Sequence, residues 1–192
     1  MTYVLSEALS NWNLIRISGF LAYFLFTFSI AAGITGRISI LQKNKQLVME
    51  LHQQSGWVGL LTVIFHFTLL LKDHYAPYTL KEIFIPFIAE NEPFYSALGT
   101  ISFYLLIITV ATSDFLMKRL GKNLWKKIHF AVIPAWLLSL LHSVFMGTDS
   151  QQMWATYLYS GGLVLIVVLL IFRYLDSQVK QNKKKVSIQK AP

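Results

Sequence analysis

Five long apolar segments constrain this chain more than any other feature. They span roughly residues 14–34, 51–72, 94–113, 128–147 and 153–174. Each approaches or exceeds the roughly 20 apolar residues that a helix needs to cross a hydrocarbon core of about 30 Å. Because a spanning segment in lipid must satisfy its own backbone hydrogen bonds, runs of this length predict helices. The sequence therefore predicts an all-α, polytopic membrane bundle of about five transmembrane helices.

The lysines and arginines predict how this bundle is oriented. The connections after the first and third segments and the C-terminal region carry most of them, which places these parts in the cytoplasm and the N-terminus outside. We expect residues 1–175 to form one transmembrane domain, and residues 176–192 to form a basic, disordered cytoplasmic tail. The expected location is the cell membrane, as a multi-pass protein. The residues on the predicted cytoplasmic side are Arg37, Lys43, Lys45, Lys118, Arg119, Lys122, Lys126, Lys127, Arg173, Lys180, Lys183, Lys184, Lys185 and Lys190.

Composition excludes two other classes of protein. The formal net charge of +8 could indicate nucleic-acid binding, but the positive residues flank apolar segments, as in ordinary membrane proteins, so no nucleic-acid partner is expected. With 55% hydrophobic residues, the chain belongs in lipid. It has no cysteine, so any haem must bind without a thioether bond. No internal sequence repeat is visible.

Four of the five histidines lie within the apolar segments, where ionisable residues are costly and usually functional. His52 and His66 are 14 residues apart in the second segment, and His129 and His142 are 13 apart in the fourth. At about 1.5 Å per residue, each pair spans roughly 20 Å along its helix. Both segments are predicted to run outward from the cytoplasm, so the four histidines fall at two matching depths.

Two imidazoles from facing helices at one depth can occupy both axial positions of a haem iron. The depths pair His52 with His129 as an inner site, and His66 with His142 as an outer site. The expected cofactors are therefore two haem b groups stacked across the membrane. An iron with both axial positions filled favours electron transfer over ligand activation.

One spacing fits an ideal helix poorly. Fourteen helical steps return His66 to within about 40° of the direction of His52, whereas thirteen steps leave His142 about 140° from His129. Pro134 lies between the latter two. Because proline removes a backbone hydrogen bond, we expect a kink or a local rewinding of the helix near Pro134.

Three further residues are candidates around these sites. Haem propionates need positive partners where they are buried, and Arg16 is placed for the outer haem and Arg37 for the inner one. Either arginine could instead merely mark the boundary of a membrane segment. The role of His74, which follows the second segment, stays open between an ordinary solvated residue and a ligand.

The double spacing, His-x13-His in one segment and His-x12-His in a later one, resembles the ferric reductase-like transmembrane domain. Ferric reductases, NADPH oxidases and the haem-binding membrane subunit of bacterial methionine sulfoxide reductase systems share this domain. The resemblance covers about residues 14–165. It implies that His52 and His129 bind the inner haem iron and that His66 and His142 bind the outer one.

The resemblance also implies a function. We expect a di-haem b protein that moves electrons from a cytoplasmic or membrane donor to an extracytoplasmic acceptor, with ferric iron as the first expected acceptor. Only a short tail follows Arg173, so a partner flavoprotein or a membrane quinol is expected to supply the electrons. The alternatives are the membrane haem anchor of a two-component reductase with an extracytoplasmic partner, a haem or metal carrier, and a purely structural anchor. Whether the chain is itself an oxidoreductase or an electron-transfer subunit stays open.

Overall fold

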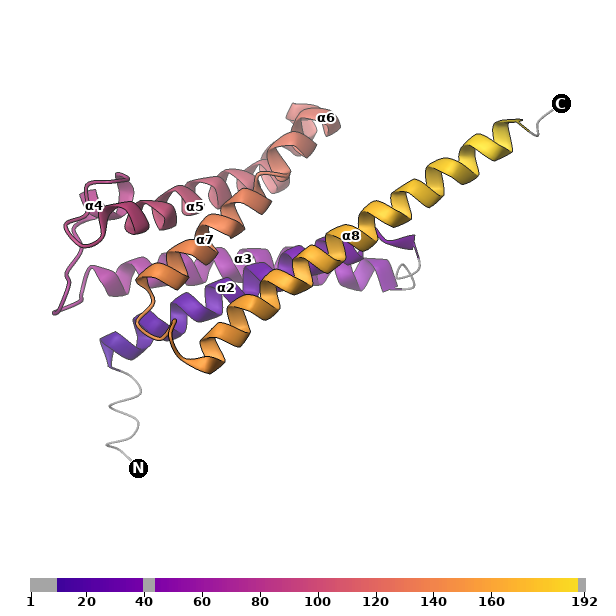
Figure 1. Cartoon of the computed structure of the whole chain (residues 1–192). Coiled ribbons are helices and arrows are strands. Elements are labelled where there is room, and N and C mark those ends of the chain that lie inside the picture. The colour runs from indigo at the N-terminus through magenta and orange to yellow at the C-terminus, as the bar shows by residue number, and fades with distance from the viewer. Residues whose placement is uncertain (1–9, 40–43, 190–192) are drawn as a thin grey trace.

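A computed structural model describes residues 10–39 and 44–189 of the chain, and this described part contains helices and no strands (Figure 1). Lys43, Lys190 and the first nine residues, on which part of the predicted orientation rests, lie outside the described residues. Five long helices occupy the predicted apolar segments, with shorter ones between them. The elements are α2 (Asn11–Thr35), α3 (Lys45–Leu70), α4 (Leu80–Phe84), α5 (Pro93–Ala111), the π-helical turn η2 (Thr112–Leu116), α6 (Met117–His129), α7 (Val132–Met146) and α8 (Met153–Gln189).

Local sequence sets several of the helix ends. The Ser10 hydroxyl accepts a hydrogen bond from the Asn13 backbone N–H and caps α2. Pro93 opens α5 at a position where its missing N–H costs nothing. Gly121 interrupts α6 with a φ of 73°, a left-handed conformation that glycine adopts without strain.

The long helices form two hairpins. α2 packs along α3, and α5 packs along α7, while α2 also contacts α7 and α8 and so joins the hairpins. Figure 1 shows α5 running toward α6 and α7 returning beside it, with α8 crossing the bundle along α2. α3 of the first hairpin carries both His52 and His66, whereas in the second hairpin His142 lies on α7 and His129 is the last residue of α6.

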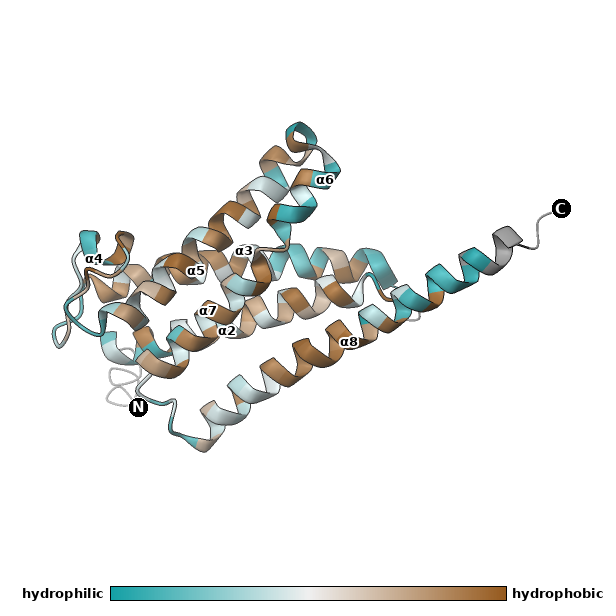
Figure 2. Ribbon diagram, turned by 45° about the horizontal axis from the view of Figure 1, so that its top comes forward, coloured by the Kyte–Doolittle hydropathy of each residue, from teal (hydrophilic) through white to brown (hydrophobic). Residues whose placement is uncertain are grey.

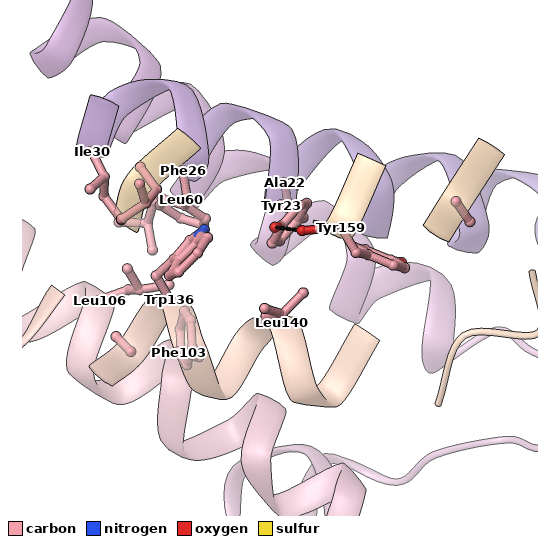
Figure 3. Packing of buried hydrophobic residues seen from close by; sticks show 13 residues of the cluster. Ala22, Tyr23, Phe26, Ile30, Leu60, Phe103, Leu106, Trp136, Leu140 and Tyr159 are labelled. Carbon is pink, nitrogen blue, oxygen red and sulfur yellow. Dashed lines mark hydrogen bonds between the residues drawn. The ribbon is translucent and has the colours of Figure 1, made fainter. Parts of the chain in front are cut away.

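An aromatic core lies where the hairpins meet. Tyr23 and Phe26 from α2 pack with Trp136 of α7 and Phe103 of α5 (Figure 3). The buried Trp136 indole donates to the Thr27 hydroxyl at 2.8 Å. These contacts hold α2 against the α5–α7 hairpin, because a buried indole N–H without a partner would be costly.

Three stretches of the described chain are long and apolar enough to cross a membrane: Asn11–Thr35, Pro93–Met146 and Met153–Lys183. The second contains both α5 and α7, which fold back on one another. Apolar residues cover the middle of the helices, and polar residues gather at α6 and at the C-terminal half of α8 (Figure 2). Many large apolar side chains are exposed, as expected where lipid replaces water. The prediction of an all-helical membrane protein is thus confirmed.

The predicted boundary at residue 175 does not coincide with a helix end. Residues 176–192 were predicted to form a disordered tail; in the structure α8 continues through Gln189, and residues 190–192 lie outside the described part of the chain. Lysine and glutamine are good helix formers, which favours this continuation. Asp176 also forms an ion pair with Lys180 one turn later, at 2.9 Å, and accepts a short hydrogen bond from the Ser39 hydroxyl. These contacts tie the polar half of α8 to the connection after α2.

Candidate haem sites

The outer histidines face one cavity. His66 of α3 and His142 of α7 both line a space of about 350 Å³. This volume lies within the range of small-molecule sites in proteins. Arg16 and Asp149 line the same cavity, together with aromatic residues of the core. The structure therefore brings together the two residues predicted for the outer haem and places the predicted arginine beside them.

The inner histidines face each other directly. The ring centroids of His52 and His129 are 5.9 Å apart, with an angle of 73° between the ring planes. Bonds between an imidazole nitrogen and a first-row metal are about 2 Å long. Two such bonds, together with the distance from each ring centre to its own nitrogen, add up to nearly the observed distance between the ring centroids. The rings could thus hold a single metal ion between them.

Each of three histidines points its Nδ1 atom at a backbone carbonyl of the neighbouring helix in its hairpin. A metal-binding histidine usually donates its second ring N–H to such a carbonyl, which fixes the ring and leaves Nε2 free to bind. The pairs are His52 with Ser29 (2.8 Å), His66 with Ile15 (3.1 Å) and His142 with Tyr95 (2.9 Å).

A glycine follows each of these three carbonyls four residues later and lies against the histidine ring. A Cβ atom at Gly99 would come within 2.8 Å of the His142 ring, and one at Gly33 within 3.0 Å of the His52 ring. At Gly19 the corresponding distance to His66 is 3.6 Å, an ordinary contact. We call each combination of carbonyl, glycine and ring a carbonyl cradle. The glycines at two of these cradles are needed because any side chain there would displace the ring.

The fourth histidine is held differently. The position that corresponds to the glycine is Ser113, in η2, and its hydroxyl lies 3.1 Å from Nδ1 of His129. The Ser113 hydroxyl donates to the Thr109 carbonyl at 2.7 Å, so it stands between the ring and the carbonyl. Serine hydroxyls also contact Nδ1 of His52 (Ser29, 3.1 Å) and of His66 (Ser18, 3.0 Å), but those two rings have a carbonyl partner as well. Within the described residues, His129 has the hydroxyl contact and no carbonyl hydrogen bond at Nδ1.

The free nitrogens fit haem better than a bare metal ion. Within the described residues, no hydrogen bond engages Nε2 of any of the four histidines. The same residues contain no cluster of three or more His, Cys, Asp or Glu side chains that could hold a metal ion. The porphyrin of a haem already binds the iron through four nitrogens, so the protein needs to supply only the axial ligands. Paired histidines are therefore a suitable donor set for haem.

The poor spacing of His129 and His142 is resolved by a break between α6 and α7. Phe130 and Ala131 form a turn between the two helices. Here Ala131 and Ile133 donate to carbonyls three residues earlier, at 2.9 and 3.2 Å, instead of four. Such bonds wind the chain more tightly than an α-helix does. The rewinding predicted near Pro134 is thus confirmed.

The two predicted arginines have different surroundings. Arg16 forms an ion pair with Asp149 in the outer cavity, and its Nε atom donates to that carboxylate at 2.5 Å. Arg37 follows α2, and its carbonyl accepts a hydrogen bond from Arg173 at 2.6 Å. Burial, and then the charge of Arg173, lower the pKa of Arg37.

Sequence reasoning missed most residues that position the rings. Gly19 and Gly33 are 14 residues apart, as are His66 and His52, which they face; Gly99 and Ser113 are also 14 apart, one more than His142 and His129. This shared spacing was the available signal. His74, by contrast, is exposed and does not line the outer cavity.

Comparison with known protein families agrees with this geometry. The model of the family described as "Ferric reductase like transmembrane component" matches residues 18–140, well over half of the chain. The match begins next to the outer cradle on α2 and includes three of the four histidines. No solved structure matches the chain. Members of this family are membrane proteins that generally bind haem, which implies electron transfer. The chain belongs to the family of ferric reductase-like transmembrane components.

Proposed function

We propose that this protein carries electrons across the cell membrane through two haem b groups. His52 and His129 bind the iron of the inner haem, and His66 and His142 bind the iron of the outer one. One observation carries the proposal: all four rings are anchored through Nδ1 and leave Nε2 free, in two pairs. A structural role alone would not require the same nitrogen to remain free four times.

In this proposal, five helices cross the membrane, namely α2, α3, α5, α7 and α8. The C-terminus and the basic helix α6 lie in the cytoplasm, and α4 lies outside. The excess of lysine and arginine on α6 and on the polar half of α8 supports this orientation. α3 is not among the three stretches that are apolar enough to cross by composition alone, but it packs along α2, and its histidines face the interior of the bundle.

The haems, when bound, supply reversible one-electron chemistry at iron. The protein supplies the rest. The cradles fix the imidazole rings, so little rearrangement accompanies a change of charge at the site. The aromatic core around Phe26 and Trp136 lies between the two levels and keeps water out of the path. A donor inside is oxidised by one electron, and an acceptor outside is reduced by one.

Positive side chains near each level assist haem binding. Arg16 contributes to the outer site and Arg37 to the inner site, where each can neutralise a propionate. A cytoplasmic flavoprotein or a membrane quinol supplies the electrons. The five basic residues of α6 offer an acidic or phosphate-bearing donor a complementary surface beside the inner site. Lys118, Arg119, Lys122, Lys126 and Lys127 form this surface.

Haem content tests the proposal directly. The protein, purified in detergent after expression with ample haem, should contain two haem b groups by pyridine haemochrome analysis. Both should give low-spin spectra, in the oxidised form and after reduction with dithionite. The double variant His66→Ala/His142→Ala should retain one haem, and His74→Ala should retain both. A wild-type protein without haem would refute the proposal, and spectra of open, exchangeable coordination would favour a carrier instead.

A further inference from the structure

The hydroxyl of Ser113 makes three contacts that together determine its polarity. It donates to the Thr109 carbonyl at 2.7 Å. It accepts from the indole N–H of Trp125 at 3.1 Å, because an indole can only donate. Its third contact is with Nδ1 of His129, at 3.1 Å. A serine hydroxyl has a single proton, and here that proton lies in the hydrogen bond to the Thr109 carbonyl.

The polarity of Ser113 fixes that of His129. Since the hydroxyl has no proton left to give, Nδ1 of His129 must be the donor in their contact. A neutral imidazole has one N–H, so a proton on Nδ1 leaves Nε2 with its lone pair exposed. That is the tautomer that can bind a metal. If Ser113 donated to Nδ1 instead, the ring proton would move to Nε2 and the ligand would be lost.

The contact with Trp125 distinguishes His129 from the three histidines in carbonyl cradles. Trp125 lies on α6, and its ring packs against His129 with 5.1 Å between centroids. Ser113 lies in the π-helical turn η2, where Asp114 also accepts a hydrogen bond from Trp57 of α3, at 2.5 Å. Such turns are rare and often occur at functional sites. This turn therefore joins the inner histidine to both α3 and α6.

We propose that Ser113 is a positioning residue that holds His129 in its metal-binding tautomer, and that Trp125, which shares the Ser113 hydroxyl, makes the inner haem electronically different from the outer one. This inference rests on the proposed function, because it assigns roles around the same inner site. At the other three histidines a carbonyl accepts the Nδ1 proton. At His129 a neutral hydroxyl does so, and it is a weaker acceptor because it is shared with Trp125.

The acceptor at Nδ1 affects the iron through the ligand. A stronger acceptor makes the imidazole more basic, which stabilises ferric iron and lowers the reduction potential. Ser113→Ala should therefore raise the potential of the inner haem, because Nδ1 loses its acceptor. Ser113→Gly should keep the potential near or below the wild-type value, because it recreates the cradle of the other histidines and exposes the Thr109 carbonyl.

Redox titration of the full-length protein with both haems bound tests this difference. The midpoint of the inner haem should rise in Ser113→Ala and not in Ser113→Gly, while that of the outer haem stays constant in both. Ser18→Ala is the matched control: the Ser18 hydroxyl contacts His66 Nδ1 at 3.0 Å, but the Ile15 carbonyl remains at 3.1 Å. Its outer midpoint should therefore shift much less. Loss of the inner haem in Ser113→Ala, with retention in Ser113→Gly, would also support the inference.

Nitrogen-15 NMR of the histidine rings tests the tautomer without haem. In the haem-free protein, the His129 signal, assigned by its loss in His129→Ala, should show the proton on Nδ1. Ser113→Ala should shift the population toward a proton on Nε2, because Nδ1 loses its acceptor. Trp125→Phe should keep the proton on Nδ1, because the hydroxyl is then no longer shared with an indole. An unchanged tautomer or an unchanged inner midpoint in Ser113→Ala would overturn the inference. A wild-type protein that binds no haem would instead refute the proposed function, and the NMR result would still stand.

Discussion

Each candidate site consists of two histidines, but the histidine rings are held differently at the two levels. At the outer level, both rings rest in carbonyl cradles and face a cavity of about 350 Å³. At the inner level, the rings are already 5.9 Å apart, one rests in a carbonyl cradle and the other contacts a hydroxyl. The ligands alone would make two equal sites. Their surroundings make two different ones.

The neighbouring charges differ as well. The outer arginine, Arg16, is neutralised by Asp149. The inner arginine, Arg37, lies beside Arg173, and no acidic partner pairs with it within the described residues. Uncompensated positive charge favours the reduced, less positive state of a haem. If the proposed haems are bound, these charges should give them different reduction potentials, although each iron would have two histidine ligands.

Removing the inner ligands should have the largest effect. In His52→Ala/His129→Ala, one haem should be lost, and electron transfer from a donor trapped inside vesicles to an outside acceptor should stop. The outer haem should remain bound and should still be reduced by dithionite added outside. Absorbance of the reduced haem in sealed, oriented vesicles measures both. Transfer at the wild-type rate would show that the inner pair is not on the path.

Gly99→Ala should produce the next largest effect, confined to the outer site. Its Cβ would come within 2.8 Å of the His142 ring, and overpacking of this kind costs about 1 to 3 kcal/mol. That corresponds to roughly 5- to 150-fold weaker binding of the outer haem. Haem titration of the apoprotein measures this affinity.

Gly19→Ala is the matched control for Gly99→Ala. The added methyl group would lie 3.6 Å from the His66 ring, an ordinary contact. Its outer haem should bind nearly as in the wild type. Equal losses in the two variants would argue against ring displacement as the cause.

Arg16→Gln should have a moderate effect that sharpens the charge comparison. It leaves Asp149, whose side chain is only 14% exposed, without its cationic partner. Loss of a hydrogen bond to a charged group costs about 1.5 to 3 kcal/mol. Thermal unfolding should begin at a lower temperature, and the outer midpoint should fall because a positive charge is removed. Arg16→Gln/Asp149→Asn should recover part of both losses, and a shift of the inner midpoint instead would contradict the assignment.

Lowering the pH should have the smallest effect, and it should destabilise only the end of the molecule that carries α4. Hydrogen bonds from the Glu90 and Thr79 backbone N–H groups and from the Thr79 hydroxyl hold the pKa of Glu82 below its ordinary value of 4.5. Because the folded pKa is depressed, this stabilisation is complete above about pH 4.5 and is lost as the pH falls through the lower folded value. Amide protection in residues 79–90, corrected for the intrinsic pH dependence of exchange, should therefore fall below pH 4.5, while protection near η2 stays constant. Glu82→Gln should remove this pH dependence.

Much of the molecule could be predicted from sequence because hydropathy acts over whole segments. Five apolar runs predicted five long helices, and the structure contains all five. The depths of the histidines predicted which rings would meet, and His52 and His129 do face each other. That these pairs bind haem stays a prediction. The disordered tail stays a prediction, although α8 continues to Gln189 in the structure and Asp176 contacts Ser39, a residue far away in sequence.

The sequence by itself determined the helical class, the membrane setting and the four histidines, because each follows from residue type and from spacing along one helix. Only the tertiary structure decided how the rings are held. The Ile15, Ser29 and Tyr95 carbonyls are accessible because a glycine on the same helix lets a ring from the next helix approach. At His129 the Ser113 hydroxyl takes the place of the carbonyl and glycine, and this difference follows from the helices that pack around the ring. Within one segment such contacts leave only a weak signal, such as the 14-residue spacing of Gly19 and Gly33, and it does not show which rings these glycines meet.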